Sequence, residues 1–221
     1  MRFDIITIFP SLFESFVNES LIKKAIQKKL LNIGVHDLRT WAYDRHKTVD
    51  DSPYGGGPGM VMKFEPFAKA LAKLKATRKT KGQKIVMLDP AGKQFTQATA
   101  ERWSKVDRIV FLCGRYEGFD HRITKLVDER VSVGPYVLNG GEVPTMAIME
   151  AISRLIPGFI GNKNSLNEET FSKQLSSLAE YPHYTRPETI EWRGKKMRVP
   201  KILLSGDPKK VTAWRTAHVK H

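Results

Sequence analysis

The sequence has one cysteine, no long hydrophobic run and no signal-like N-terminus. With Cys113 as its single cysteine among 221 residues, the chain cannot form an internal disulfide framework, which is typical of proteins from a reducing compartment. No apolar run approaches the roughly 18 residues of a membrane span. The opening MRFDIITIFP carries an acid and a proline, and it predicts a first strand rather than a signal peptide. We therefore expect a cytoplasmic protein with no membrane association.

Standard motifs for nucleotide phosphates and structural metals are also missing. There is no G-x-G-x-x-G, and Gly92-Lys93 is followed by Gln94 and lacks the earlier glycine of a P-loop. This excludes a Rossmann dinucleotide site and argues against a phosphate-loop hydrolase. The six histidines show no H-x₃-H spacing and no C-x₂-C partner, so no metal-ligating residue is predicted. The sequence leaves a requirement for Mg²⁺ open.

Positive charge is abundant but unevenly placed. The net charge of +14 comes from two segments: residues 63–84 contain eight Lys or Arg and one acid, and residues 181–221 contain ten and three. The rest of the chain is balanced. Such a distribution favours a polyanionic partner, with RNA or DNA as the first candidate. A solubilising surface is an equally good explanation of composition alone.

Three glycine-bearing loops carry the strongest signal in the sequence. They are MLDPAG (Met87 to Gly92), CGRYEG (Cys113 to Gly118) and SVGPYVLNGGEVP (Ser132 to Pro144). The first two follow largely apolar runs, Ile85–Leu88 and Arg108–Leu112, which are typical of parallel strands covered on both faces. Open α/β sheets bind ligands at the carboxyl ends of such strands, and glycine lets the backbone approach a ligand closely. We predict one nucleoside-sized pocket built mostly from main chain.

The coarse pattern predicts an α/β domain followed by a small basic region. We place the catalytic and cofactor-binding domain at residues 1–160, a polar linker at 161–168 and the basic region at 169–221. Strands are expected at Phe3–Phe9 and Val35–Leu38, and helices at Pro66–Lys79 and Thr145–Ile156. Beyond the linker we expect a helix near 169–178, a strand over MRVPKILL (197–204) and a short helix from Asp207.

Several individual residues have both a functional and an ordinary interpretation. Cys113 ends an apolar run with no base beside it in sequence, and it is expected to pack in the core. Arg154 lies four residues after Glu150, which suits a surface ion pair. It is also the single basic residue of an otherwise apolar helix that begins at the third glycine loop. The segment DRHKTVDDSPYGGGPGM (Asp44–Met60) combines four glycines, two prolines and several charges, so it is either an idle loop or part of a site.

Six segments occur in an order that resembles bacterial tRNA (guanine-37-N1)-methyltransferases. They are DRHKTVDDSPYGGGPGM, CGRYEGFD, SVGPYVLNGGE, ISRLIPG, PHYTRPE and LLSGD…WR, and together they span nearly the whole chain. The resemblance implies a parallel α/β sheet with a deep C-terminal trefoil knot, one of the rare exceptions to unknotted topology, and a small basic helical C-terminal region. It also implies S-adenosylmethionine as cofactor, tRNA as substrate, and a homodimer with active sites between subunits.

The resemblance further assigns roles to residues. It implies that the cofactor is bound by Met87, Leu88, Asp89, Pro90, Gly114, Tyr116, Glu117, Gly118, Ser132, Val133, Gly134, Pro135, Tyr136, Val137, Leu138, Gly140, Gly141 and Pro144. Asp50, Gly59, Glu117 and His183 match positions that contact the substrate. The family mostly has Asp where this chain has Pro135.

The resemblance also supplies the chemistry of the reaction. Guanine N1 carries a proton at neutral pH, so its methylation needs a general base, and the charge that develops on O6 needs a cation. By resemblance the cation is Arg154, and the base is Glu169, where the family usually has Asp. The bridge from Glu169 to PHYTRP is longer than usual in the family. The alternative is a non-catalytic RNA-binding protein on the same fold, but such a module needs neither Arg154 nor an acid at 169.

Overall fold

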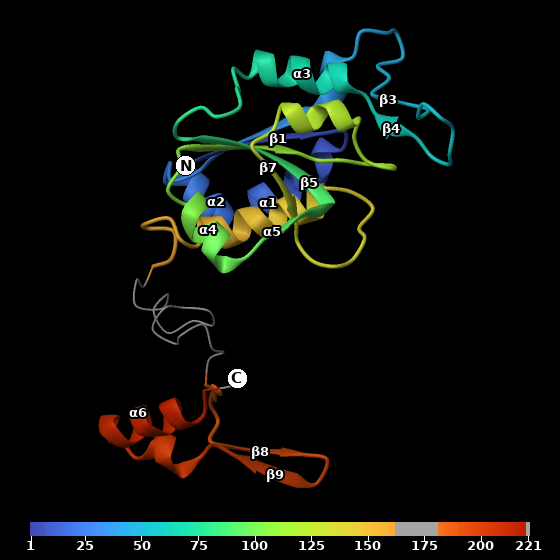
Figure 1. Cartoon of the computed structure of the whole chain (residues 1–221). Coiled ribbons are helices and arrows are strands. Elements are labelled where there is room, and N and C mark those ends of the chain that lie inside the picture. The colour runs from blue at the N-terminus through green and yellow to red at the C-terminus, as the bar shows by residue number, and fades with distance from the viewer. Residues whose placement is uncertain (162–180, 220–221) are drawn as a thin grey trace. The chain divides into compact units, whose positions relative to one another are not determined.

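The computed structural model describes residues 1–161 and 181–219 (Figure 1). The chain forms two compact units, Met1–Gly161 and Asn162–His221, each described here by itself. The expected linker after residue 161, the helix near 169–178 and the candidate base Glu169 lie outside the described residues.

The first unit is built on a five-stranded parallel sheet. Its order is β2-β1-β6-β5-β7, and all four neighbouring pairs run parallel. The strands are β1 (Arg2–Thr7), β2 (Asn32–Asp37), β5 (Gln83–Gln94), β6 (Arg108–Leu112) and β7 (Glu129–Ser132). The prediction of a parallel α/β sheet is therefore confirmed. The apolar runs at Ile85–Leu88 and Arg108–Leu112 form the adjacent strands β5 and β6.

Helices cover both faces of this sheet, as Figure 1 shows. One face carries α3 (Phe64–Lys73), and the other carries α1 (Glu14–Asn18), α2 (Ser20–Gln27), α4 (Gln97–Trp103) and α5 (Glu142–Ser153). Successive residues of β6 contribute to two separate hydrophobic cores. Phe111 packs in the cluster with α5, and Val110 packs in the cluster with α3. This double burial explains why β5 and β6 read as continuous apolar runs rather than as an alternating pattern.

Shorter elements connect these layers. Three 3₁₀ helices are η1 (Pro10–Phe13), η2 (Leu38–Trp41) and η3 (His121–Lys125). The side chain of Asp37 caps η2 by accepting from the Arg39 amide, and Asp120 caps η3 by accepting from the Arg122 amide. The antiparallel pair β3 (Asp50–Asp51) and β4 (Val61–Met62) closes the base of the glycine-rich segment between them. Among the described residues, no helix is long and apolar enough to cross a bilayer.

The second unit combines a β-hairpin with a helix. Its described elements are β8 (Thr189–Trp192), β9 (Lys195–Arg198), η5 (Lys201–Leu204) and α6 (Pro208–Ala217). The helix predicted from Asp207 is confirmed, because the Asp207 carboxylate accepts from the Lys209 and Lys210 amides at 3.0 and 3.3 Å. The single strand predicted over 197–204 is wrong. Pro200 cannot donate to a strand ladder, so β9 ends at Arg198 and the segment after the proline forms a 3₁₀ turn.

Candidate cofactor-binding site

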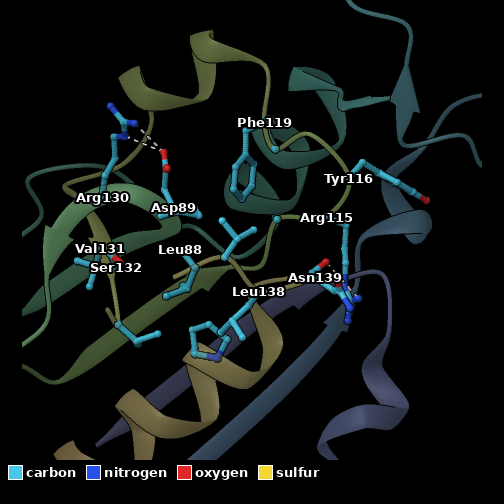
Figure 2. A pocket seen from close by; sticks show the side chains of 18 of the residues that line it. Leu88, Asp89, Arg115, Tyr116, Phe119, Arg130, Val131, Ser132, Leu138 and Asn139 are labelled. Atoms are coloured by element: carbon cyan, nitrogen blue, oxygen red, sulfur yellow. Dashed lines mark hydrogen bonds and ion pairs between the residues drawn. The ribbon is translucent and has the colours of Figure 1, made fainter. Parts of the chain in front are cut away.

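A pocket of about 400 Å³ lies beside the middle of β5 and at the ends of β6 and β7 (Figure 2). The three glycine-bearing loops converge on it, as the sequence predicted. It is lined by Leu88, Asp89, Pro90, Gly114, Arg115, Tyr116, Glu117, Gly118, Phe119, His121, Arg130, Val131, Ser132, Val133, Tyr136, Val137, Leu138, Asn139, Gly140, Gly141 and Pro144. Figure 2 shows Leu88 and Leu138 between the Asp89–Arg130 pair on one side and Arg115 on the other.

Most residues expected to bind the cofactor line this pocket, but Met87, Gly134 and Pro135 do not. Successive side chains of a strand point to opposite faces, so Met87 packs in the cluster with α3 while Leu88 faces the other side. Gly134 is hydrogen-bonded to the side chain of Ser132, which donates to the Gly134 carbonyl at 2.8 Å and accepts from the Gly134 amide at 3.2 Å. Pro135 is exposed outside the pocket.

The first loop is an irregularity within β5. Leu88 and Lys93 are both opposite Val131 of β7, so the residues between them bulge out of the ladder and reach the pocket. Gly92 closes this bulge against the backbone of β7. A Cβ at Gly92 would lie 2.5 Å from the Val131 nitrogen, closer than real contacts allow. The sequence signal Pro-Ala-Gly thus marks a bulge, and glycine is required where the strand rejoins the sheet.

The second and third loops touch through main chain. The amide of Gly141 donates to the carbonyl of Gly114 at 2.9 Å. A Cβ at Gly141 would lie 2.8 Å from Cys113 Cα and 3.0 Å from the Gly114 nitrogen. Only glycine permits this approach, so both loops present backbone groups to one cavity.

A buried ion pair fastens the same two loops, and sequence reasoning missed it. Arg115 donates through Nε to the carboxylate of Glu142 at 2.9 Å and through Nη1 to the Asn139 carbonyl at 3.3 Å. Glu142 is fully buried in the first turn of α5, where the helix dipole favours negative charge. The hydroxyl of Thr7, at the end of β1, donates to its other oxygen at 2.7 Å. Charged residues inside glycine motifs, RYEG and GGE, are the signal that was available.

A second ion pair lies at the rim of the pocket. Arg130 donates to Asp89 through Nε and Nη2 at 3.0 and 2.7 Å (Figure 2). The pair joins β7 to the bulge of β5, two strands that are far apart in sequence but adjacent in the sheet. No local sequence pattern points to Arg130. Phe119, His121 and Val131 also line the pocket and were not predicted.

Cys113 is a core residue, as predicted. It is fully buried, and its sulfur lies 3.3 Å from the hydroxyl of Thr145. Burial, reinforced by the nearby charge of Glu142, raises the pKa of the Cys113 thiol far above its usual range. The thiol therefore stays protonated and unreactive.

Two of the residues assigned to the substrate lie together. A Cβ at Gly59 would be 2.5 Å from Glu117 Oε1, and the Glu117 amide donates to the Met60 carbonyl at 3.0 Å. The glycine-rich segment therefore packs against the second pocket loop. Asp50 begins the β3–β4 ladder at the base of that segment. His183 belongs to the second unit, where its ring lies 4.8 Å from that of Tyr181.

Arg154 does not line the pocket of its own chain. It caps the C-terminal end of α5, whereas Glu142 at the other end of this 12-residue helix contacts the pocket loops. At about 1.5 Å per residue, the helix places the two backbones roughly 18 Å apart. The predicted cation and the predicted cofactor pocket are therefore separated within one chain.

The chemistry of the pocket fits a nucleoside-type cofactor. Apolar side chains from all parts of the lining, such as Leu88, Val133, Leu138 and Pro144, suit a flat base, and glycines of the second and third loops leave room for a ligand close to the main chain. S-adenosylmethionine combines such a base with a ribose and a charged amino-acid part. In residues 1–161 and 181–219, no group of three or more His, Cys, Asp or Glu side chains is placed to hold a metal ion. Nothing here supports the Mg²⁺ requirement that the sequence left open.

The fold and pocket define a class of protein, a parallel α/β domain with a ligand-sized pocket beside the carboxyl ends of its strands. A family model described as tRNA (Guanine-1)-methyltransferase TrmD matches residues 1–221. The chain belongs to this family.

Proteins named tRNA (guanine-N(1)-)-methyltransferase resemble the chain over most of their length. The protein of Rhodococcus jostii is 50% identical over 221 residues, which cover 97% of this chain and 93% of that protein. The protein of Thermobifida fusca is 48% identical over 221 residues, with 97% and 82% covered. That of Cutibacterium acnes is 46% identical over 220 residues, with 97% and 90% covered.

Proposed function

We propose that the protein transfers a methyl group from S-adenosylmethionine to N1 of guanosine 37 in tRNA. The observation that carries this proposal is the pocket where Gly114 and Gly141 meet, in a chain whose whole length matches the tRNA (guanine-1)-methyltransferase family. The family and the names of the relatives do not favour the alternative of a non-catalytic RNA-binding protein.

The cofactor is held by the three loops. S-adenosylmethionine supplies an electrophilic methyl group bound to a sulfonium. Leu88, Leu138 and Pro144 pack against its apolar surface, and the backbone of the second and third loops hydrogen-bonds its polar edges. The Arg115–Glu142 pair keeps these loops in contact, so the pocket is formed before the cofactor binds.

The substrate side requires a base and a cation. Removal of the guanine N1 proton is assigned to the carboxylate of Glu169, and the negative charge that develops on O6 is stabilised by Arg154. Glu117, which lies beside Gly59 at the pocket, helps to hold the target base together with Asp50 and His183.

The separation of Arg154 from its own pocket supports a homodimer with shared sites. Arg154 lies at the far end of α5 from the pocket loops, so a site that contains both needs Arg154 from a second subunit. A symmetric dimer supplies two such composite sites. The family resemblance also implies a trefoil knot, and the contact between Gly114 and Gly141 supports a topology in which the third loop passes beside the second.

The organisation of the chain follows from these roles. Residues 1–160 form the catalytic and cofactor-binding part, residues 161–168 link it to the remainder, and residues 169–221 bind tRNA. Nine Lys or Arg against three acids among residues 181–219 support this role. A tRNA substrate and a chain with one cysteine suit the cytoplasm.

Label transfer tests the proposed reaction. Purified protein is incubated with methyl-labelled S-adenosylmethionine and either a tRNA transcript with guanosine at position 37 or the same transcript with adenosine there. We expect label on the first RNA only, recovered as N1-methylguanosine after digestion. Label on both transcripts, or on neither, contradicts the proposal.

A further inference from the structure

The β8–β9 hairpin exposes every one of its strand residues. All eight residues of β8 and β9 are exposed, including Trp192 at 63%, Ile190 at 47% and Met197 at 46%. A two-stranded hairpin is marginally stable on its own in water, and exposed large apolar side chains mark interaction sites when they gather on one face. The hairpin thus has the properties of a binding element.

Its cross-strand register places the apolar side chains together. Ile190 is opposite Met197, and Trp192 is opposite Lys195. Because alternate residues of a strand share a face, these four side chains lie on one side of the hairpin. The other side carries Thr189, Glu191, Lys196 and Arg198. One face is therefore an apolar strip that ends in an indole and a lysine.

The turn of the hairpin carries an arginine in an unfavourable backbone conformation. Arg193 and Gly194 connect the strands with φ values of 51° and 73°. Positive φ at both positions is the type I′ pattern, in which Asn-Gly is preferred, and a long side chain at the first position costs free energy. The Arg193 guanidinium lies over the Trp192 ring, with Cζ 5.6 Å from its centroid. A costly arginine beside an exposed indole points to a functional tip.

Charge identifies the kind of partner. Arg193, Lys195, Lys196 and Arg198 lie within six positions, and none of them forms an ion pair with another residue in the described parts of the chain. An apolar protein surface would leave these cations unpaired at the contact. An RNA strand complements both the cations and the exposed indole of the hairpin, because phosphates neutralise the cations and the face of an unpaired base stacks on an indole.

We propose that the hairpin tip binds an unpaired nucleotide of the tRNA, with Trp192 stacked on its base and Arg193 and Lys195 at the flanking phosphates. This inference rests on the proposed function, since it assigns residues to recognition of the same substrate. It separates two contributions. Stacking by Trp192 depends on unpaired bases and not on salt, whereas the contacts of the basic residues depend on salt and not on base pairing.

Four variants of the full chain and two RNAs test the proposal. Dissociation constants are measured over a range of salt for an unmodified tRNA transcript and for an RNA duplex of similar length without unpaired nucleotides. Trp192→Leu should weaken binding of tRNA about tenfold, leave binding of the duplex unchanged and keep the salt slope. Trp192→Phe keeps an aromatic ring and should stay close to wild type. Lys195→Ala combined with Lys196→Ala should flatten the salt slope by about one to two units for both RNAs.

Arg193→Asn distinguishes a loss of tRNA binding from a loss of folding. Asparagine suits the turn position better, so this variant should unfold at a temperature no lower than the wild type and yet bind tRNA several-fold more weakly. Wild-type affinity in Arg193→Asn, or equal loss of tRNA affinity in Trp192→Phe and Trp192→Leu, overturns the proposal. Methyl transfer to tRNA by the wild type is measured in parallel, because its absence would refute the reaction and leave the binding results valid.

Discussion

The guanidinium of Arg115 and the carboxylate of Glu142 meet at 2.9 Å between the second and third pocket loops. Glu142 is fully buried, and Thr7 of β1 donates to the same carboxylate, so one buried charge connects the end of β1 with both loops. The Arg115 side chain is 21% exposed, which leaves little water to replace Glu142 as its partner. We therefore expect the pocket and the stability of the first unit to depend on this pair.

Glu142→Gln tests that dependence. The substitution keeps the shape and removes the charge, which leaves a mostly buried guanidinium without its counter-ion, and it should lower the free energy of unfolding by about 3 kcal/mol. Affinity for S-adenosylmethionine, measured by calorimetry, should fall at least tenfold. Asp120→Asn is the matched control, because its partner Arg122 is 64% exposed and such pairs contribute under about 1 kcal/mol. Wild-type affinity and stability in Glu142→Gln would show that the pair does not shape the pocket.

A second buried carboxylate lies away from the pocket. Asp4 of β1 is fully buried and interacts with Arg2 at 2.8 Å, His36 at 2.8 Å and Arg108 at 2.7 Å. Burial by itself would raise the pKa of the Asp4 carboxyl. The hydrogen bonds from His36, Arg2 and Arg108 outweigh that effect and hold the pKa well below its usual range.

Asp4→Asn should destabilise the first unit by about 3 kcal/mol near neutral pH, because it leaves the largely buried Arg108 guanidinium without its counter-ion. Because the pKa of Asp4 is lower in the folded state than in the unfolded state, the Asp4 charge stabilises the protein fully at pH values above the unfolded-state pKa of about 4. This stabilisation is lost as the pH falls through the folded-state pKa. The difference in unfolding free energy between wild type and Asp4→Asn should therefore be large from pH 7 to about pH 5 and shrink below about pH 4. Urea unfolding across this range measures it.

The expected control for Asp4 is Asp51→Asn. The Asp51 side chain is 70% exposed and pairs with Lys63 at 3.4 Å. Exposed pairs of this kind contribute little, so Asp51→Asn should unfold close to the wild type at every pH. A difference between wild type and Asp4→Asn that stayed constant down to pH 2 would contradict the role given to the Asp4 charge.

Subunit mixing tests the shared site. Gly141→Val damages the pocket, because even a Cβ at this position would lie 2.8 Å from Cys113 Cα, and Arg154→Ala removes the cation. Each homodimer should be inactive. A mixed dimer has one site with an intact pocket from the Arg154→Ala chain and an intact Arg154 from the other chain, so mixing should restore up to about half the wild-type activity per mixed dimer. Absence of recovery, in a sample where mass spectrometry shows mixed dimers, would place Arg154 and the pocket in the same subunit.

The strands β5 and β6 and the positions of the loops were predictable, because they depend on local patterns. Apolar runs without alternation identify strands covered on both faces, and glycines after such runs mark loops at one edge of the sheet. Those two rules predicted that the three loops form one pocket, and the structure adds a 2.9 Å hydrogen bond between Gly141 and Gly114 within it. The helix expected from Thr145 begins earlier, at Glu142, because Pro144 is tolerated within a first turn that needs no amide donor.

Contacts between distant segments were not predictable from one sequence. Arg130 meets Asp89 because β7 lies beside β5, and strand order is not encoded in any local pattern. The Arg115–Glu142 pair likewise needs the second and third loops to be adjacent. The strand expected over 197–204 failed for a local reason, since Pro200 outweighs the β-branched and apolar residues around it.

The remaining prediction concerns Glu169, the residue proposed to accept the guanine N1 proton. Glu169→Gln keeps the size of the side chain without useful basicity, so it should remove nearly all methyl transfer while binding of S-adenosylmethionine, measured by calorimetry, stays unchanged. Glu168→Gln is the matched control and should remain active.

The informative variant is Glu169→Asp, which restores the residue usual in the family. A misplacement of about 1 Å can lower a rate on the order of a hundredfold, and Asp is one methylene shorter than Glu. We therefore expect Glu169→Asp to be slower than the wild type in single-turnover assays. Wild-type rates in Glu169→Gln together with loss of activity in Glu168→Gln would move the base to the neighbouring carboxylate.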